Sequence, residues 1–157
     1  MENKKSRLLI AIAVIVALIL LASAFYWFLA PKEPQQIDGV VDHKSIGGIK
    51  ADTGYTLVMF TPHGLNIDPS VIDLFAGQDI NMTISSELEK ELEQRGYKVH
   101  YVGNIRLDSP DDFNEIDSGS TLGYFLPSRD DFNRLVMGSN VTIEVSRDHM
   151  ATIQRVL

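Results

Sequence analysis

A histidine at the end of a predicted strand is the residue of this sequence best placed to carry out chemistry. His63 lies in Thr61-Pro62-His63-Gly64, directly after the apolar run Leu57–Phe60. In a parallel α/β sheet, functional residues gather at the carboxyl ends of strands. An imidazole there can bind a metal ion or act as a general base. The alternative is a Pro-His-Gly turn whose imidazole is exposed to solvent.

The remaining histidines and the paired aspartates indicate structural roles. His43, His100 and His149 are scattered along the chain, and no pair has the i, i+4 spacing of helical zinc ligands. Asp111-Asp112 and Asp130-Asp131 fall in the first turns of two predicted helices, where negative charge complements the helix dipole. His63 is therefore the candidate metal ligand, and the sequence offers no catalytic set around it.

Three motifs between residues 57 and 102 follow one another in an order known from a family of enzymes. LVMFTPHG contains His63, Asp79-Ile80-Asn81-Met82 follows it, and RGYKVHYV begins at Arg95. In this order they resemble the opening of the zinc-dependent N-acetylmuramoyl-L-alanine amidases, which cleave peptidoglycan. The resemblance implies that His63 occupies the place of a zinc-binding histidine.

The sequence departs from the amidase pattern at the other ligand positions. Gly77 stands where the family has a glutamate ligand, and His149 is displaced from the later strand motif. A catalytic zinc site needs three protein ligands and an open position. The resemblance therefore implies either a relative that has lost metal and activity or an atypical zinc hydrolase centred on His63.

An apolar segment near the N-terminus predicts a membrane anchor. Residues 8–30 contain no charged residue, and a helix of that length would span about 34 Å at about 1.5 Å per residue. Lys4, Lys5 and Arg7 precede it, so the positive-inside rule puts residues 1–7 in the cytoplasm and the rest of the chain outside. The alternative is a cleavable signal peptide, for which Ala22-Ser23-Ala24 provides a small-x-small site.

The remainder of the chain is predicted to be a linker, residues 31–37, and one acidic domain, residues 38–157. From Asp38 onward there are 19 acidic and 10 basic residues, a net charge of −9. Such a domain repels phosphate backbones, which argues against nucleic acid as a partner. The chain has no cysteine, so the domain must be stabilised by apolar packing without disulfides.

Alternating helix and strand signals predict an α/β domain with a mostly parallel sheet. Because the helices are short, an α+β domain with a mixed or antiparallel sheet is the alternative. Each helix is predicted to begin at a capping residue and to end at glycine. The predicted helices run over residues 68–77, 86–96, 109–119 and 128–138, and the predicted strands over residues 56–61, 80–84, 97–102, 121–126, 141–145 and 151–156.

Two helical segments share a repeated pattern that predicts equivalent packing. Ser109-Pro-Asp-Asp-Phe-Asn and Ser128-Arg-Asp-Asp-Phe-Asn lie 19 residues apart, and Phe113 and Phe132 are expected to be equivalent core residues.

Taken together, the sequence favours a membrane-anchored, extracytoplasmic and non-catalytic module that binds an unidentified protein or ligand. The alternatives are an amidase-like zinc hydrolase centred on His63 and a structural subunit of a membrane complex.

Overall fold

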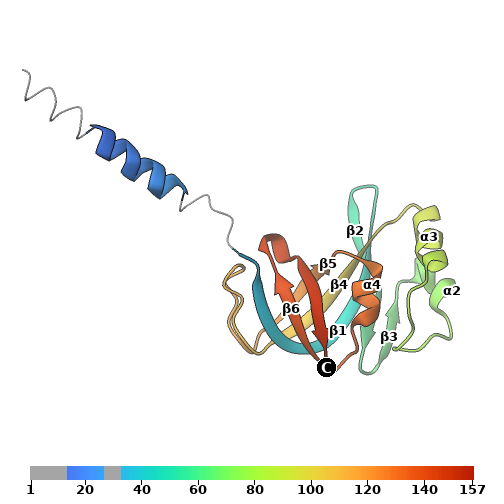
Figure 1. Cartoon of the computed structure of the whole chain (residues 1–157). Helices are drawn as coiled ribbons and strands as arrows, with labels where there is room; N and C mark the ends of the chain where they lie inside the picture. The colour runs from blue at the N-terminus through green and yellow to red at the C-terminus, as the bar shows by residue number, and fades with distance from the viewer. Residues whose placement is uncertain (1–13, 27–32) are drawn as a thin grey trace, which may run out of the picture. The chain divides into compact units, whose positions relative to one another are not determined.

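The computed structural model describes residues 14–26 and 33–157 of the chain, and residues 34–157 form a compact unit. This unit contains a seven-stranded sheet and a few short helices (Figure 1). The strands are β1 (Gln35–Lys50), β2 (Thr53–Thr61), β3 (Gly64–Ile67), β4 (Lys98–Leu107), β5 (Thr121–Leu126), β6 (Asn140–Val145) and β7 (Ala151–Val156). The helices are η1 (Pro69–Val71), α2 (Ile72–Phe75), α3 (Ser86–Gln94), α4 (Arg129–Arg134) and η2 (Arg147–His149).

The predicted α/β class with a mostly parallel sheet is wrong. Neighbouring strands follow the order β3-β2-β1-β4-β5, β6 also pairs with β1, and β7 pairs with β6. Each of these six ladders is antiparallel. The domain is therefore α+β with an antiparallel sheet, as in the alternative.

The connections explain why the sheet is antiparallel. Parallel neighbours need a crossover of a dozen or more residues, whereas antiparallel neighbours need only a short turn. β2 and β3 are joined by Pro62-His63 alone, and β6 and β7 by the short turn containing η2. The helices α2, α3 and α4 have 4, 9 and 6 residues. They cover one face of the sheet and do not alternate with parallel strands.

The long strand β1 is the centre of the sheet, and the sequence prediction missed it. Its first residues pair with β6 along one side, its last residues pair with β2 on that same side, and β4 runs along the other. Its glycines resemble turn signals. However, a Cβ at Gly47 would collide with the ring of His100, and one at Gly39 would collide with the backbone of Arg106. These glycines therefore allow close approach of neighbouring strands.

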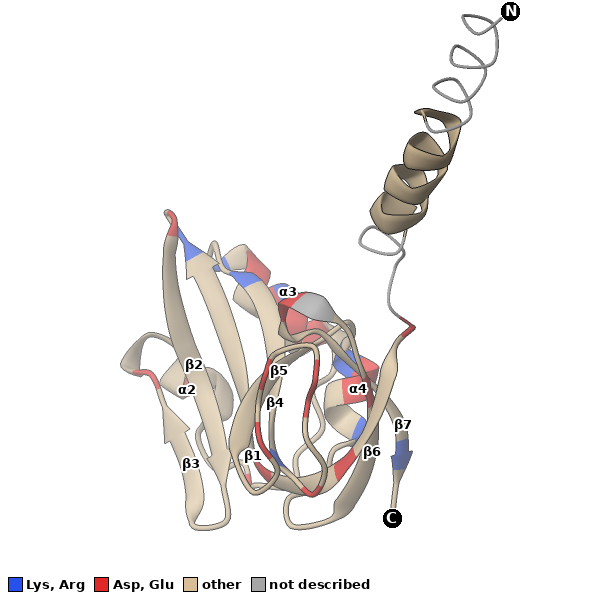
Figure 2. Ribbon diagram, turned by 90° about the vertical axis from the view of Figure 1, so that its left-hand side faces the viewer, with Lys and Arg blue, Asp and Glu red and all other residues tan. Residues whose placement is uncertain are grey.

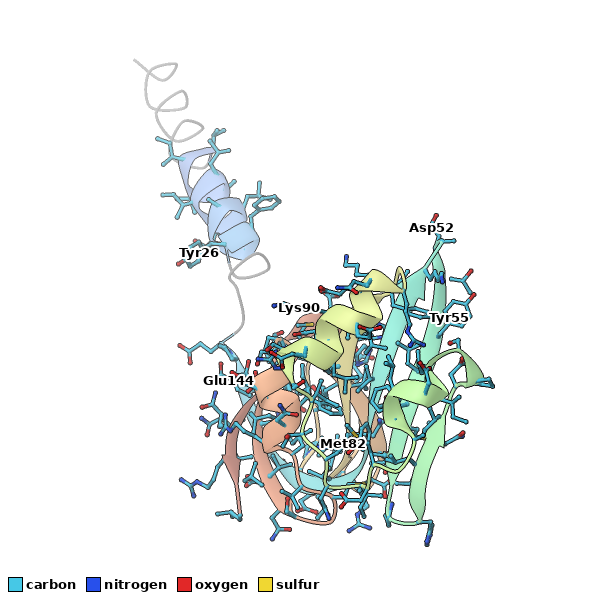
Figure 3. All side chains as sticks on the ribbon, turned by 90° about the vertical axis from the view of Figure 1, so that its right-hand side faces the viewer. Tyr26, Asp52, Tyr55, Met82, Lys90 and Glu144 are labelled. Atoms are coloured by element: carbon cyan, nitrogen blue, oxygen red, sulfur yellow. The ribbon has the colours of Figure 1, made fainter. Side chains whose placement is uncertain are left out.

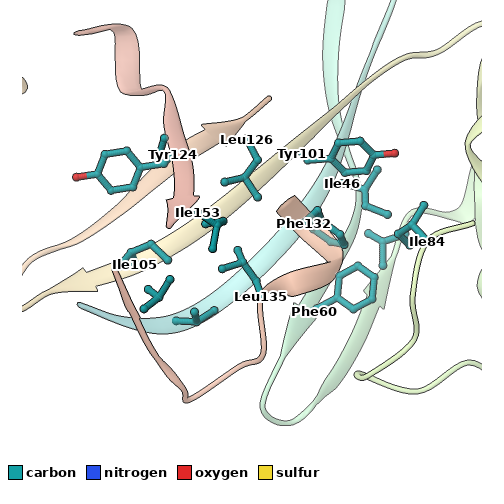
Figure 4. Packing of buried hydrophobic residues seen from close by; sticks show 14 of the residues in the cluster. Ile46, Phe60, Ile84, Tyr101, Ile105, Tyr124, Leu126, Phe132, Leu135 and Ile153 are labelled. Atoms are coloured by element: carbon teal, nitrogen blue, oxygen red, sulfur yellow. The ribbon is translucent and has the colours of Figure 1, made fainter. Parts of the chain in front are cut away.

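The core lies between the sheet and the short helices, and Figure 4 shows the part of it around α4. Phe132 of α4 is fully buried, with its ring centroid 5.5 Å from that of Phe60 and 5.2 Å from that of Tyr101. Ser128 begins α4, because its hydroxyl accepts a hydrogen bond from the amide of Asp131.

A buried lysine connects this aromatic cluster to the end of α4. The Nζ of Lys44 donates to the carbonyls of Phe132 (3.2 Å) and Leu135 (3.0 Å), and it lies 4.4 Å from the centroid of the Phe132 ring. Burial lowers the pKa of Lys44 to about 8. The two carbonyls at the carboxyl end of the helix and the ring face favour the charged form. The Lys44 ammonium therefore has a structural role in the core.

The predicted membrane-spanning helix is not found among the residues that the structure describes. Residues 14–26 are helical, and at about 1.5 Å per residue they extend about 20 Å, less than the roughly 30 Å of a bilayer core. In the described ranges, no helix is both long and apolar enough to cross a membrane. The other residues of the predicted segment, 8–13 and 27–30, lie outside the described residues.

Candidate functional site

His63 lies in the two-residue turn that joins β2 to β3, and its imidazole is exposed. The Thr61 hydroxyl accepts a hydrogen bond from the backbone amide of His63 (3.3 Å) and donates to the carbonyl of Gly64 (3.0 Å). Gly64 has φ +138°, which non-glycine residues rarely adopt. The Thr-Pro-His-Gly sequence therefore makes the turn, and it places His63 at the end of a strand as the sequence predicted.

The structure does not bring a metal-binding set to His63. Over residues 14–26 and 33–157, no three His, Cys, Asp or Glu side chains are grouped so that they could hold a metal ion. His43 contacts the neighbouring Asp42 carboxylate at 2.9 Å, and the His100 ring packs against Phe125 with centroids 5.7 Å apart. Desolvation lowers the pKa of His100, which favours its neutral form.

The segments that resemble the amidases have other surroundings here. Asp79 accepts a hydrogen bond from the amide of Asn81 (2.7 Å) within a turn, so Ile80–Ile84 is not the predicted strand. The segment from Arg95 leads into β4, which pairs with β1 and β5 and not with β2. β2 and β4 are therefore separated by β1 in the sheet.

A groove of about 470 Å³ lies beside the turn that carries His63. Apolar side chains from three segments form much of its wall: Leu65 and Ile67 of β3, Phe75 of α2, and Ile80 of the following loop. Phe75 is fully buried, whereas the other three are partly exposed. Its titratable lining residues are His63 and Asp79.

Contacts of Asp68 and Arg95 hold η1 and α2, next to the groove, in place. Asp68 caps η1 through hydrogen bonds from the amide and hydroxyl of Ser70. Arg95 makes a two-pronged ion pair with Asp73 of α2 and also donates to the carbonyl of Ser70. The hydrogen bond from Arg95 lowers the pKa of Asp73. These contacts fix η1 and α2 relative to the start of β4.

The strand β3 borders the groove with a free backbone edge. β3 is the last strand of the sheet path, and Figure 3 shows it at the margin of the sheet with α2 in front. The amide of Asp68 donates to Leu57 of β2 (2.9 Å). Because hydrogen-bonded and non-hydrogen-bonded pairs alternate in an antiparallel ladder, Asn66 also faces β2. The backbone N–H and C=O groups of Leu65 and Ile67 therefore point away from β2.

Sequence reasoning found His63 but missed the strand and the groove next to it. β3 has four residues, Gly64-Leu65-Asn66-Ile67, too few to show a clear alternation. The available signal was the two-residue spacing between two β-rich runs, which is typical of a hairpin.

Comparisons with known proteins add no identification: no family model, curated protein or solved structure matches this chain.

Replacement of His63 by alanine is expected to leave the free energy of unfolding within about 0.5 kcal/mol of the original, because the imidazole is exposed and the turn is held by Thr61 and Gly64. Chemical denaturation measures the stability, and zinc analysis of the purified protein checks for metal. A loss of bound zinc together with a loss of stability would revive a metal-binding role for His63.

Proposed function

We propose that residues 34–157 form a non-catalytic binding module for a protein partner, held at a membrane by the apolar N-terminal segment and facing outside the cytoplasm. The observation that carries the proposal is the groove beside β3, where apolar side chains and a free strand edge occur together. Concave, mostly apolar surfaces with a few polar groups are common features of binding sites.

The chemistry of the groove supports binding over catalysis. Of its two titratable lining residues, Asp79 is engaged in a turn through its hydrogen bond from Asn81. Acid–base or nucleophilic catalysis needs a second group within hydrogen-bonding reach of the first. The structure gives His63 no such pairing with Asp79, and much of the surrounding wall is apolar.

The membrane location is supported by the sequence of the N-terminal segment. Residues 8–30 are uncharged and follow a basic tail, the pattern of segments that stay in a membrane with the tail in the cytoplasm. The domain is acidic, and Figure 2 shows acidic residues on α3, on α4 and along the loop between β4 and β5. A domain with net negative charge gains nothing from anionic lipid headgroups, which favours a protein as the partner.

The proposal is tested by photocrosslinking in native membranes. A photoreactive amino acid at Gln78, an exposed residue of the groove, is expected to give a defined adduct in the carbonate-resistant membrane fraction. The same amino acid at Gln154, an exposed glutamine of β7, is the matched control. When Ile80→Asp is introduced into the protein that carries the photoreactive amino acid at Gln78, the adduct should disappear. The partner would then have to bury a carboxylate in the groove.

Either of two outcomes would contradict the proposal. Adducts of equal yield at Gln78 and Gln154 would show that the groove is not a specific surface. Recovery of the protein outside the membrane fraction would contradict the membrane location.

A further inference from the structure

We propose that the groove receives an extended segment of the partner that pairs with β3 as an added strand, and that this segment alternates apolar with basic residues. This inference rests on the proposed function and specifies the partner's conformation and chemistry. In such strand addition, main-chain hydrogen bonds supply affinity and pockets for alternate side chains supply specificity.

The backbone of β3 offers the groups that an added strand requires. Leu65 and Ile67 each direct one N–H and one C=O away from β2, as the register and the Asp68–Leu57 hydrogen bond establish. An antiparallel or parallel segment beside β3 can therefore form hydrogen bonds with both residues. A helix placed there would leave these backbone groups without hydrogen-bond partners, so the free edge favours an extended segment.

The side chains beside the edge favour apolar residues at alternate positions. Leu65 and Ile67 pair with Phe60 and Val58, so their side chains point to the core face of the sheet. The groove continues this face outward to Ile80. Side chains of an added strand alternate between the two faces, so every second one would enter the groove and the others would face solvent.

The outer edge of β5 is better protected than that of β3. The outer side of β5 forms a bridge between Phe125 and Met150, next to η2 and β7. Natural edge strands commonly carry charged residues or proline, which discourage pairing with another chain. β3 carries neither, since its residues are Gly64-Leu65-Asn66-Ile67.

The charge around the groove favours basic residues in the partner segment. Residues 61–84 contain Asp68, Asp73 and Asp79 and no lysine or arginine. Arg95 pairs with Asp73, which leaves Asp68 and Asp79 as negative charges next to the groove. Exposed charges of this kind contribute mainly to specificity and association rate, and their effect weakens with salt.

The test measures amide hydrogen exchange in the full-length chain, labelled with ¹⁵N and held in detergent micelles. The probe is a short peptide of alternating lysine and valine, blocked at both ends. Binding is expected to slow exchange of the Leu65 and Ile67 amides by about tenfold or more, because they become hydrogen-bonded. The Asn66 amide already faces β2 and serves as the internal control.

Variants and a second peptide make the outcome decisive. Ile67→Pro removes one outward N–H without removing a hydrogen bond to β2, and it should weaken peptide binding about tenfold. Asn66→Ala changes a side chain on the opposite face and should bind normally. A peptide of alternating glutamate and valine should bind about tenfold more weakly at low salt, and equal binding would remove the basic preference.

The result that overturns the inference is unchanged exchange at Leu65 and Ile67 with saturating peptide in a protein whose melting temperature is normal. If the Gln78 adduct and its loss in Ile80→Asp persisted, the binding function would stand and only the strand-pairing mode would fail. If the crosslinking also failed, the proposed function itself would fall.

Discussion

Replacing Phe132 by alanine is expected to lower the free energy of unfolding by about 3–5 kcal/mol, the range for large aromatic side chains removed from a core. Phe132 is fully buried and contacts the rings of Phe60 and Tyr101. Its loss would also take the ring face away from the buried ammonium of Lys44. Chemical denaturation of the full-length chain, followed by circular dichroism, measures the difference.

The matched control is Phe113→Ala, the corresponding residue of the repeated pattern. The sequence predicted equal burial for the two phenylalanines, but Phe113 is only partly buried. Its replacement is expected to cost roughly 1–2 kcal/mol. Equal losses at the two positions would contradict the packing described here.

A double replacement tests whether the aromatic cluster and the lysine act together. Lys44→Met keeps a side chain of similar length and removes the charge. If the ring stabilises the ammonium, Lys44→Met should cost less in the Phe132→Ala background than in the original protein. Strict additivity would show that the 4.4 Å approach contributes little.

The sequence predicted local elements well where capping residues and alternation agreed. The predicted strands at residues 121–126 and 151–156 coincide with β5 and β7, and β7 pairs with β6 as expected of a hairpin. α3 lies within the predicted helix at residues 86–96, although the capping hydroxyl belongs to Ser85 and not to Ser86, which was predicted to begin the helix. Each of these features depends on residues close together in the chain.

The errors came from contacts between residues far apart in the chain. Ile84 lies in a segment predicted as a strand, but its backbone N–H and C=O are hydrogen-bonded by the side-chain amide of Asn133 on α4. The Asn133 side chain therefore takes the place of the neighbouring strand with which Ile84 was expected to pair. Strand order likewise depends on which strands meet in space, and the sequence does not show this. The alternation of short helices and strands was therefore taken for strand-helix-strand units with parallel strands.

The repeated pattern shows how one buried residue can change local structure. Ser128 caps α4, whereas the same pattern from Ser109 forms a turn in which Asp111 and Ile116 pair by two backbone hydrogen bonds. The difference is that the Asp111 side chain is fully buried and turned inward. Its carboxylate accepts from the amides of Phe113 (3.0 Å) and Asn114 (3.1 Å), so it holds a turn where a helix was predicted.

This carboxylate makes Asp111→Ala the second replacement with a large expected effect. Its Oδ2 also accepts from the Tyr124 hydroxyl and from the Asn114 side chain, both at 2.7 Å. Alanine would leave the buried Tyr124 hydroxyl and the turn amides without this acceptor, at an expected cost of about 3–4 kcal/mol. Asp112→Ala, the exposed neighbour, should stay within about 0.5 kcal/mol of the original.

The effect of Asp111 should depend on pH in a defined direction. Desolvation alone would raise its pKa, but the hydrogen bonds from Tyr124, Asn114 and Phe113 outweigh it, and the net pKa is lowered. The unfolded chain therefore binds the proton more readily than the folded one. The stabilisation is complete above the ordinary carboxyl pKa of about 4 and is lost as the pH falls through the lowered folded value.

The stability difference between the original protein and Asp111→Ala should consequently narrow between neutral pH and about pH 3, while Asp112→Ala shows no such trend. Denaturation curves of the three proteins at both pH values measure this. A difference that stayed constant would mean that the charge on Asp111 contributes nothing and that shape and neutral hydrogen bonds hold the turn. Asp111→Asn keeps the shape but turns one acceptor oxygen into an NH2 donor, which would face groups that donate to the carboxylate, so it is expected to be less stable than the original protein at neutral pH in either case.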